Sequence, residues 1–422
     1  MATTVSTIVQ QEHVRFLSTE LSVYSLEQGK QPEPLTVQPS QKALVLQAVR
    51  EAYTLVTDHE VPALAHPDEI LIKVAAVGLN PVDWKAPAFN FGIPGLPWVF
   101  GRDLAGIVVK TSPSHSPSSR IQVGDLVLVP STDYRDIRKA AFQEYAVTSH
   151  YNAAKIPRNI SIHQGACLGV AYVAAALALG VCFGLDFSTS TAAAGPDLMH
   201  ILGGINKSTI PEDIAGECFP TGETQHVKQG EWIAIWGAST TTGYIMIQLA
   251  KQCGLKVICV ADISRHGRTL HEVGADLLVD RFDEKRAVEI IRGVTSGRLR
   301  YALDMVGRET ATILQEALCI SPDGPQAHLL GLTGMPKERH PHIRYHSVPI
   351  KLFHICEPVA EGLMRWLECL LETGALTPPD LIVRDDGLAG VNDALNMLRD
   401  GSASNRRVVI DMNCSDVSRA RE

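Results

Sequence analysis

The alternation of apolar and polar positions is most regular in the middle of the chain, where an apolar run at residues 231–238 precedes a short polar loop and an amphipathic helix. The apolar face of that helix consists of Ile245, Met246, Leu249 and Ala250. Gly254 supplies a stop signal, and a second apolar run follows at residues 257–262. The order strand, loop, helix, strand within about 30 residues predicts a dinucleotide-binding unit, with an ordinary α/β turn as the alternative.

The loop of this unit reads Gly237-Ala-Ser-Thr-Thr-Thr-Gly243. It lacks the full G-x-G-x-x-G fingerprint, because Thr240 stands where many such loops have their middle glycine. A small polar loop between a buried strand and a helix aims free backbone N–H groups and the positive helix end at a pyrophosphate. The loop therefore predicts a nicotinamide dinucleotide cofactor.

The end of the second apolar run carries signals for both nicotinamide cofactors. Asp262 would accept a hydrogen bond from a ribose 2′-OH and repel a 2′-phosphate, which favours NADH. Ser264, Arg265, His266 and Arg268 follow at once, and a hydroxyl with guanidinium groups at a helix start suits a phosphate. The alternative is that Ser264 caps the helix and the arginines are solvated. We expect NADPH, with NADH as the other option.

Further patterns divide the chain into two kinds of module. Strand patterns separated by Gly, Pro and Ser lie at residues 42–49, 69–77, 106–110, 126–130 and 142–147. Beyond the phosphate loop, strands at 276–280, 301–306 and 328–332 alternate with helices at 284–291 and 309–318. Helices at 359–372 and 388–398 and a strand at 407–410 complete the pattern. The expected fold class is α/β, with a mostly β module and a doubly wound parallel sheet.

Three segments fall outside these patterns. Residues 1–40 are polar and end in a Pro-rich run, and we interpret them as a mobile N-terminal extension. Residues 166–185 are uncharged and as long as a membrane span, but their many Ala and Gly residues favour a buried helix at a domain junction. An insertion at 183–229, with an apolar patch at 198–202, is long enough to form a lid, a contact surface or a disordered loop.

Composition limits the class of protein. With 422 residues, of which 45% are hydrophobic and 20% charged, the chain has room for two domains of a soluble globular protein. The net charge of −8 argues against a nucleic-acid partner. Nine scattered cysteines without C-x-x-C pairs fit a reducing compartment and offer no four-cysteine zinc site. We expect a cytoplasmic protein that does not bind a membrane.

Three motifs carry a resemblance to a known family: Gly78-Leu-Asn-Pro-Val-Asp-Trp-Lys85, Phe100-Gly-Arg-Asp-Leu-Ala-Gly106 and Val123-Gly-Asp-Leu-Val127. With the phosphate loop behind them, residues 41–412 resemble the medium-chain dehydrogenase/reductase superfamily. Within it, the chain is most similar to the zinc-free quinone oxidoreductases and the trans-acting enoyl reductases of fungal polyketide synthases. The resemblance implies a GroES-like, β-rich substrate domain and a Rossmann-type cofactor domain, with the active cleft between them.

The resemblance also implies domain bounds and site residues. Beyond the extension at 1–40, the parts are a first piece of the GroES-like domain at 41–165, a Rossmann domain at 166–345 that carries the insertion, and a C-terminal segment at 346–422 that completes the substrate domain. Val82, Asp83, Trp84 and Lys85 would border the nicotinamide and its ribose, and Ser239, Thr240, Thr241 and Thr242 would hold the pyrophosphate. Ser264, Arg265, His266 and Arg281 would surround the adenosine phosphate, while Gly331 and Ser404 would approach the nicotinamide end.

Metal-ligating residues are missing where related zinc dehydrogenases have them. Neither cysteine nor histidine is present at Asn80 to Asp83 or at Arg102 and Asp103. Without a Lewis acid, alcohol oxidation is disfavoured, whereas the β-carbon of an enone or enoyl thioester is already electrophilic. The sequence therefore predicts NADPH-dependent reduction of an activated C=C bond in an enoyl thioester or enone. The expected substrate is polyketide-like, and the expected reaction uses no zinc.

Two residues are candidates for the chemistry. Lys85 would orient the nicotinamide ribose or hydrogen-bond the substrate, unless it is a solvated lysine after a tight turn. Tyr172 would donate the proton, unless it is a packed aromatic and solvent supplies that proton. A histidine cluster, His340, His342, His346 and His354, has irregular spacing that favours a surface or cleft-lining role over a metal site.

One departure leaves a second function open. Where trans-acting enoyl reductases have a Ser/Thr-containing helix start, this chain has Val173-Ala-Ala-Ala176, so a hydroxyl that would fix the carboxamide is missing. The alternative is a non-redox accessory protein that keeps the fold and steers cyclisation of a polyketide intermediate; a nucleotide-binding structural protein is a third possibility. Expected partners are a small or carrier-bound polyketide-like substrate and a polyketide synthase, and the chain would be a monomer or a homodimer.

Overall fold

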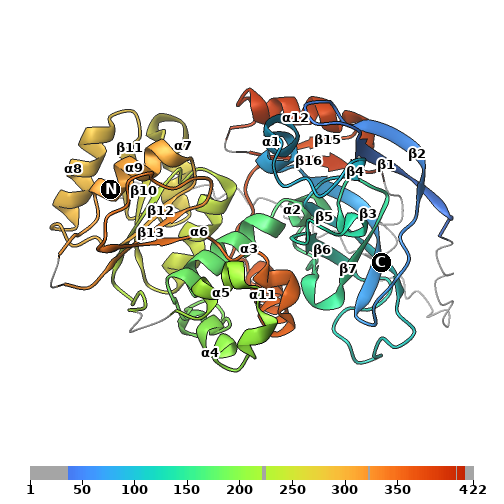
Figure 1. The fold of residues 1–422 in the computed structure, drawn as a ribbon, viewed down its shortest axis with the longest axis horizontal. Helices are drawn as coiled ribbons and strands as arrows, with labels where there is room; N and C mark the ends of the chain where they lie inside the picture. Colours follow the sequence, from blue (N-terminus) through green and yellow to red (C-terminus); the bar gives the residue numbers. More distant parts are fainter. Residues whose placement is uncertain (1–36, 221–224, 322–323, 405, 414–422) are drawn as a thin grey trace, which may run out of the picture. The chain divides into compact units, whose positions relative to one another are not determined.

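The computed structural model describes residues 37–220, 225–321, 324–404 and 406–413. The predicted mobile extension at 1–40 lies outside the described residues up to position 36, and its last residue, Ser40, begins strand β1. Figure 1 shows the described chain with two separate groups of strands.

The first group is β-rich and largely antiparallel (Figure 1). Its strands are β1 (Ser40–Leu46), β2 (Thr54–Glu60), β3 (Glu69–Gly78), β4 (Trp98–Val99), β5 (Asp103–Thr111), β6 (Leu126–Pro130), β7 (Tyr145–Ser149), β8 (Ala154–Lys155), β15 (Leu381–Arg384) and β16 (Arg407–Asp411). A seven-stranded sheet has the order β15-β16-β3-β5-β6-β8, with β7 also paired to β3, and a three-stranded sheet has the order β2-β1-β4. The near-continuous apolar run of β3 is buried along almost its whole length, as expected for a central strand covered on both faces.

The C-terminal end of the chain returns to this first sheet. Strand β16 pairs antiparallel with β3, so that Val409 lies opposite Gly78, and β15 pairs parallel with β16. Segments more than 300 residues apart in sequence therefore form one sheet, which places the carboxyl end of the chain next to the motif at 78–85.

The second group is a six-stranded sheet in which every pair is parallel. Its strands are β9 (Trp232–Trp236), β10 (Lys256–Ala261), β11 (Leu277–Asp280), β12 (Tyr301–Asp304), β13 (Ala327–Gly331) and β14 (Ile343–His346), in the order β11-β10-β9-β12-β13-β14. The helices α6 (Thr241–Gln252), α7 (Ile263–Glu272), α8 (Glu284–Val294) and α9 (Arg308–Glu316) connect them.

Alternate residues of each central strand of this sheet enter different cores. Ile233 and Ile235 of β9 pack in one hydrophobic cluster with the apolar face of α6. Ala234 and Trp236 pack in another cluster on the opposite side, with residues of α8 and α9. Helices thus cover both faces of a parallel sheet, and the predicted doubly wound architecture is confirmed.

The periodic segments of the sequence form the elements that their patterns predict. All four apolar residues predicted on the inner face of α6 are buried, and Gly254 has the positive φ (73°) that the helix end requires. Helices α8, α9, α11 (Glu357–Glu372) and α12 (Val391–Arg399) lie within a few residues of their predicted bounds. The prediction missed helix α1 (Pro81–Phe89), which begins and nearly ends with proline.

Residues 166–185 form buried helical structure, as predicted. The segment runs from the end of α2 (Ile162–Ala166) through α3 (Gly169–Leu177) into a π-helical turn, η3 (Ala178–Cys182), and α3 packs against α6. In the part of the chain that the structure describes, no helix combines the length and the apolar character needed to cross a membrane.

The insertion at 183–229 is packed against the body of the protein where it is described. It contains α4 (Leu198–Gly203), α5 (Glu212–Cys218) and the 3-10 helices η4 (Phe187–Thr189) and η5 (Lys207–Thr209). The rings of Phe187 and Trp366 lie 4.5 Å apart, and Trp366 Nε1 donates a hydrogen bond to the carbonyl of Ala193 (2.9 Å). The remaining short helices are α10 (Leu352–Ile355), η1 (Ile137–Lys139), η2 (His150–Asn152) and η6 (Gly387–Gly390).

Candidate functional site

The phosphate loop is built by two glycines and a threonine cap. Gly237 has φ of 79°, and a side chain there would lie only 2.7 Å from Val306. Gly243 is pressed against the loop, since a Cβ atom would lie 2.8 Å from the carbonyl oxygen of Ala238. Thr240 has an extended backbone, and its hydroxyl accepts a hydrogen bond from the Gly243 N–H (3.1 Å). The middle position therefore needs no glycine, because it serves as the N-cap of α6.

A first cavity of about 180 Å³ lies beside this loop, between the two sheets. The cofactor side contributes Ser239, Thr240, Thr241 and Tyr244, and the other side contributes Pro81, Leu398, Arg406 and Arg407. The N-terminal turn of α6, which carries the positive end of the helix dipole, opens into this space. The predicted loop thus meets the motif at 78–85 through the first residue of α1.

A second cavity of about 300 Å³ extends from the same loop to the ends of β10 and β11. Its lining includes Gly237, Ser239, Thr240, Asp262, Arg265, His266, Arg281, Thr310 and Ser404. Two guanidinium groups and the N-terminus of α7 therefore border one space, an arrangement that favours an anionic group.

Asp262 and Ser264 are engaged with each other at the start of α7. The Asp262 carboxylate accepts hydrogen bonds from the Ser264 hydroxyl (2.7 Å) and from the Arg265 N–H (3.2 Å). The hydrogen bond from Ser264 is the main reason that the pKa of Asp262 lies below its ordinary value. Asp262 is thus the cap, whereas the sequence offered Ser264 for that position.

His266 reaches across to the other part of the chain. Its Nε2 lies 3.3 Å from the Ser404 hydroxyl, and its buried Nδ1 has no hydrogen-bond partner among the described residues. Burial lowers the pKa of His266, against the attraction of Asp262, so a neutral ring borders the cavity at neutral pH. Arg268 points away, since its side chain is 92% exposed and paired with Glu272.

The four residues predicted to border the nicotinamide, Val82 to Lys85, all lie in helix α1 but have different surroundings. Asp83 is fully buried, and its carboxylate accepts the Asn80 N–H (2.7 Å). Burial raises the pKa of Asp83 to about 7. Val82 is half-buried against the core of the β-rich part. The Asp83 carboxylate therefore stabilises the N-terminus of α1.

Trp84 faces a different hollow, and Lys85 lies beside its ring. The Lys85 ammonium lies 5.7 Å from the centre of the Trp84 ring, and the Arg399 guanidinium lies 5.3 Å from it. Trp84 lines a third cavity of about 330 Å³ with Tyr53. Among the described residues, neither Trp84 nor Lys85 lines the first or the second cavity.

A buried ion pair occupies the region where related zinc enzymes have metal ligands. Arg407 Nη2 donates to Asp103 Oδ2 (2.8 Å), and the Asn80 side chain donates to the same oxygen (2.9 Å). The other oxygen, Asp103 Oδ1, accepts the Val170 N–H (2.6 Å). These contacts join β16, β5, the start of α1 and α3, and they satisfy the carboxylate without a metal.

Three further predicted residues lie at different depths. Tyr172 is fully buried, its hydroxyl donates to the carbonyl of Leu363 (3.0 Å), and burial raises its pKa well above the ordinary value. This is the packed-aromatic alternative, so we withdraw Tyr172 as the proton donor. Gly331 ends β13, where a Cβ atom would lie 2.1 Å from the carbonyl oxygen of Gly334. Thr242 follows the cap within α6 and is half-buried.

Several residues of the cavities carry no signal in the sequence. Tyr244 is indistinguishable from an ordinary helix residue, and Thr310 and Leu398 lie in helices predicted only for their packing. Arg406 is near the predicted Ser404, which was its only signal. Leu398 and Arg406 belong to the C-terminal end of the chain, which returns through the pairing of β16 with β3, and local patterns do not encode this long-range pairing.

Comparison with known proteins agrees with this architecture. Residues 66–158 match the family model described as the alcohol dehydrogenase GroES-like domain, and residues 241–362 match the one described as zinc-binding dehydrogenase. A trans-enoyl reductase of Botryotinia fuckeliana is 28% identical over 372 residues, covering 82% of this chain and 92% of that protein. One of Petromyces alliaceus is 25% identical over 402 residues, covering 89% and 98%.

Solved structures show the same fold. An alcohol dehydrogenase superfamily protein from Novosphingobium aromaticivorans has a TM-score of 0.67 at 18% identity, covering 88% of this chain and 99% of its own. The Escherichia coli quinone oxidoreductase complexed with NADPH has a TM-score of 0.63 at 17% identity, with the same coverage. The chain belongs to the medium-chain dehydrogenase/reductase superfamily. Its glycine-shaped loop and the adjoining cavity, which contains two arginines, fit a nicotinamide dinucleotide.

Proposed function

We propose that this protein is an NADPH-dependent reductase of an activated C=C bond in an enoyl thioester or enone of polyketide type. The second cavity carries the proposal, because Arg265 and Arg281 border it together with the N-terminus of α7. Guanidinium groups at this place suit a 2′-phosphate, which distinguishes NADPH from NADH. The similarity to fungal trans-enoyl reductases supports the substrate class.

In this proposal a bound NADPH would supply the hydride for the β-carbon, and the α-carbon would take up a proton. Ser239, Thr240 and Thr241 orient the pyrophosphate at the start of α6. Lys85 remains a candidate for positioning the substrate or the ribose, and solvent supplies the proton. Asn80, Asp103 and Arg407 hydrogen-bond to one another where related zinc enzymes have ligands, and the proposal assigns polarisation of the carbonyl to a hydrogen bond.

The proposal includes a polyketide-like substrate bound to a carrier of a polyketide synthase, and the similarity to trans-enoyl reductases supports it. We propose a cytoplasmic location, which agrees with the eight unpaired cysteines among the described residues. The proposal includes no nucleic-acid partner, and a monomer or a homodimer is compatible with it.

An assay of hydride transfer tests the function. Purified protein is incubated with NADPH and a panel of enoyl thioesters and enones while the absorbance of the reduced nicotinamide is followed. We expect oxidation of NADPH with at least one α,β-unsaturated member and none with its saturated counterpart. Tight NADPH binding without turnover on any member would contradict the proposal.

One observation favours the second candidate function, a non-redox accessory of a synthase. Ala174 of α3 is buried, and Val173-Ala-Ala-Ala176 carries no side-chain hydroxyl where the resemblance to trans-acting enoyl reductases implies one. Deuterium on the transferring carbon of NADPH separates the two functions. Its appearance in the product supports reduction, and a cyclised product without deuterium supports the accessory role.

A further inference from the structure

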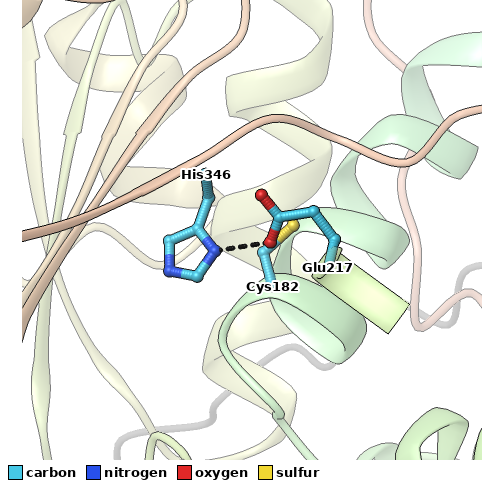
Figure 2. Close-up of side chains that lie close together, drawn as sticks. All are labelled: Cys182, Glu217 and His346. Atoms are coloured by element: carbon cyan, nitrogen blue, oxygen red, sulfur yellow. Dashed lines mark hydrogen bonds and ion pairs between the residues drawn. The ribbon is translucent and has the colours of Figure 1, made fainter. Parts of the chain in front are cut away.

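A group of three metal-binding side chains lies outside the cofactor cleft. Cys182 ends the π-helical turn η3, Glu217 lies in α5, and His346 ends β14. The thiol, a carboxylate oxygen and a ring nitrogen of these residues all lie within 4.8 Å of one another. Figure 2 shows that the three side chains point toward one another from separate elements.

The contacts within this group are short and directional. His346 Nδ1 lies 2.8 Å from Glu217 Oε2, and the other carboxylate oxygen accepts the Ser347 N–H (2.9 Å). On its far side, His346 Nε2 lies 2.9 Å from Nδ1 of His328 in β13. A histidine whose second nitrogen has a fixed partner is held in one ring orientation, as metal-binding histidines usually are.

Aromatic rings surround the group on the side of His346, whereas the side of Glu217 is partly exposed to solvent. Phe183 packs edge-on to His346, and Tyr301 stacks on His328 with ring centres 4.9 Å apart. Cys182 and His346 are buried, whereas 18% of the Glu217 side chain is exposed. The carboxylate therefore marks a path by which an ion can enter.

We propose that Cys182, Glu217 and His346 bind one divalent transition-metal ion, with zinc as the best match. Sulfur, imidazole nitrogen and carboxylate oxygen together suit Zn²⁺ and Co²⁺, whereas Mg²⁺ and Ca²⁺ prefer oxygen alone. A thiolate and a carboxylate balance the two positive charges of the ion. Three protein ligands leave a fourth position for water.

The ion would join the insertion to the edge of the parallel sheet. Its ligands come from η3, from α5 in the insertion and from the edge strand β14, and none of them lines the first or the second cavity. The position also differs from the one at Asn80 and Asp103, where related zinc enzymes have ligands. We therefore assign the ion a structural role that is independent of the proposed reductase activity.

The competing explanation is a metal-free network. His346 and Glu217 already form a hydrogen bond, and Arg344 donates to the carbonyl of Gly216 nearby (3.2 Å). In that case the Cys182 thiol is an ordinary buried cysteine. Burial, together with the charge of Glu217, raises the pKa of this thiol, as for other buried cysteines.

Cobalt substitution distinguishes the two explanations. The full chain, freed of any affinity tag, is stripped with a chelator and titrated with Co²⁺, and the metal content of the untreated protein is measured by mass spectrometry. We expect one equivalent of zinc as purified, and a thiolate-to-cobalt charge-transfer band that saturates at one equivalent. Absence of both the zinc and the band in the wild-type chain would overturn the proposal without any variant.

Variants then locate the site. Cys182→Ser should abolish the charge-transfer band, and Glu217→Gln should weaken Co²⁺ binding at least tenfold while the band remains. The matched controls are Cys369→Ser, at an exposed cysteine, and Cys356→Ser, at a buried one, and both should keep the band. A band of full strength in Cys182→Ser would show that the ion binds elsewhere and would refute the assignment.

Discussion

Arg265 is the residue on which the choice between NADPH and NADH depends most directly. Its guanidinium borders the second cavity, and a charge-assisted hydrogen bond contributes about 1.5–3 kcal/mol. We expect Arg265→Ala to weaken NADPH binding roughly tenfold or more and to leave NADH binding nearly unchanged. Calorimetric titration with each nucleotide measures the difference.

The neighbouring Arg268 provides the control for this prediction. It lies on the same helix, but its side chain is exposed and paired with Glu272. Arg268→Ala should therefore bind both nucleotides like the wild-type protein. Equal loss of NADPH and NADH affinity in Arg265→Ala would contradict the assignment of a 2′-phosphate to this cavity.

Asp83 should make stability depend on pH. Burial raises its pKa from 3.8 to about 7, so between these values the folded protein binds a proton that the unfolded chain does not. The stabilising effect of that proton is complete below the unfolded pKa and is lost as the pH rises to about 7. Asp83→Asn removes this titration and should flatten the fall in the urea midpoint between pH 5 and pH 7.

The comparison for Asp83 is an exposed carboxylate in the same part of the chain. Asp58 lies on the solvent-exposed face of β2, and Asp58→Asn should reproduce the wild-type pH profile. If Asp83→Asn and the wild-type protein lose the same stability over this pH range, the buried carboxylate titrates outside it.

At the scale of elements, the ion pair between Arg407 and Asp103 joins β16 to β5. Both side chains are at least 94% buried, and removal of one partner leaves an uncompensated charge that costs about 3–5 kcal/mol. Arg407→Leu should lower the free energy of unfolding by this amount. Urea denaturation without nucleotide measures it, because Arg407 also borders the first cavity.

Strand β15 supplies the matched control for this pair. Arg384 pairs with Asp386, and both side chains are more than a third exposed. Exposed pairs contribute about 0–1 kcal/mol, so Arg384→Ala should have little effect. If both variants lost a similar free energy of unfolding, burial would not explain how much the Arg407–Asp103 pair contributes to stability.

Elements were predictable where their own apolar positions show that they are buried. The four apolar residues named on α6 and the apolar run of β9 indicated both elements without any tertiary information. Helix α1 was missed because Pro81 and Pro87 resemble turn residues, although Pro81 is at the first helical position, where proline is favoured. A local pattern predicts a segment only where the order of its apolar and polar residues follows from the way that segment packs.

Sites assembled from distant elements were predictable only in part. The loop at 237–243 is contiguous, so its own sequence indicated it, even with Thr240 in place of the middle glycine. His346 was expected at a surface or in a cleft because its partners, Cys182 and Glu217, are more than 120 residues away in the sequence. Tyr172 lies on a helix of the predicted kind, but only its burial shows that it packs against Trp366 instead of facing a substrate.

At the scale of the whole molecule, the first cavity makes cofactor binding a contact between two parts of the chain. It is lined by Ser239 and Thr241 of the cofactor side and by Pro81 and Leu398 of the other side. A ligand that binds only the folded state at a hundred times its dissociation constant adds about 2.7 kcal/mol to the free energy of unfolding. That stabilisation should therefore reach both sheets.

Hydrogen exchange with two ligands tests this coupling. NADPH fills both cavities in our proposal, whereas 2′,5′-ADP lacks the nicotinamide half and fills only the second one, which Arg265 and Ser404 line. Both ligands should slow exchange in the first turn of α7. Only NADPH should also slow exchange in the first turn of α1, because Pro81 borders the first cavity. Protection by NADPH confined to residues 232–310 would mean that the cofactor binds to one part of the chain alone, and that the substrate side closes on it by some other contact.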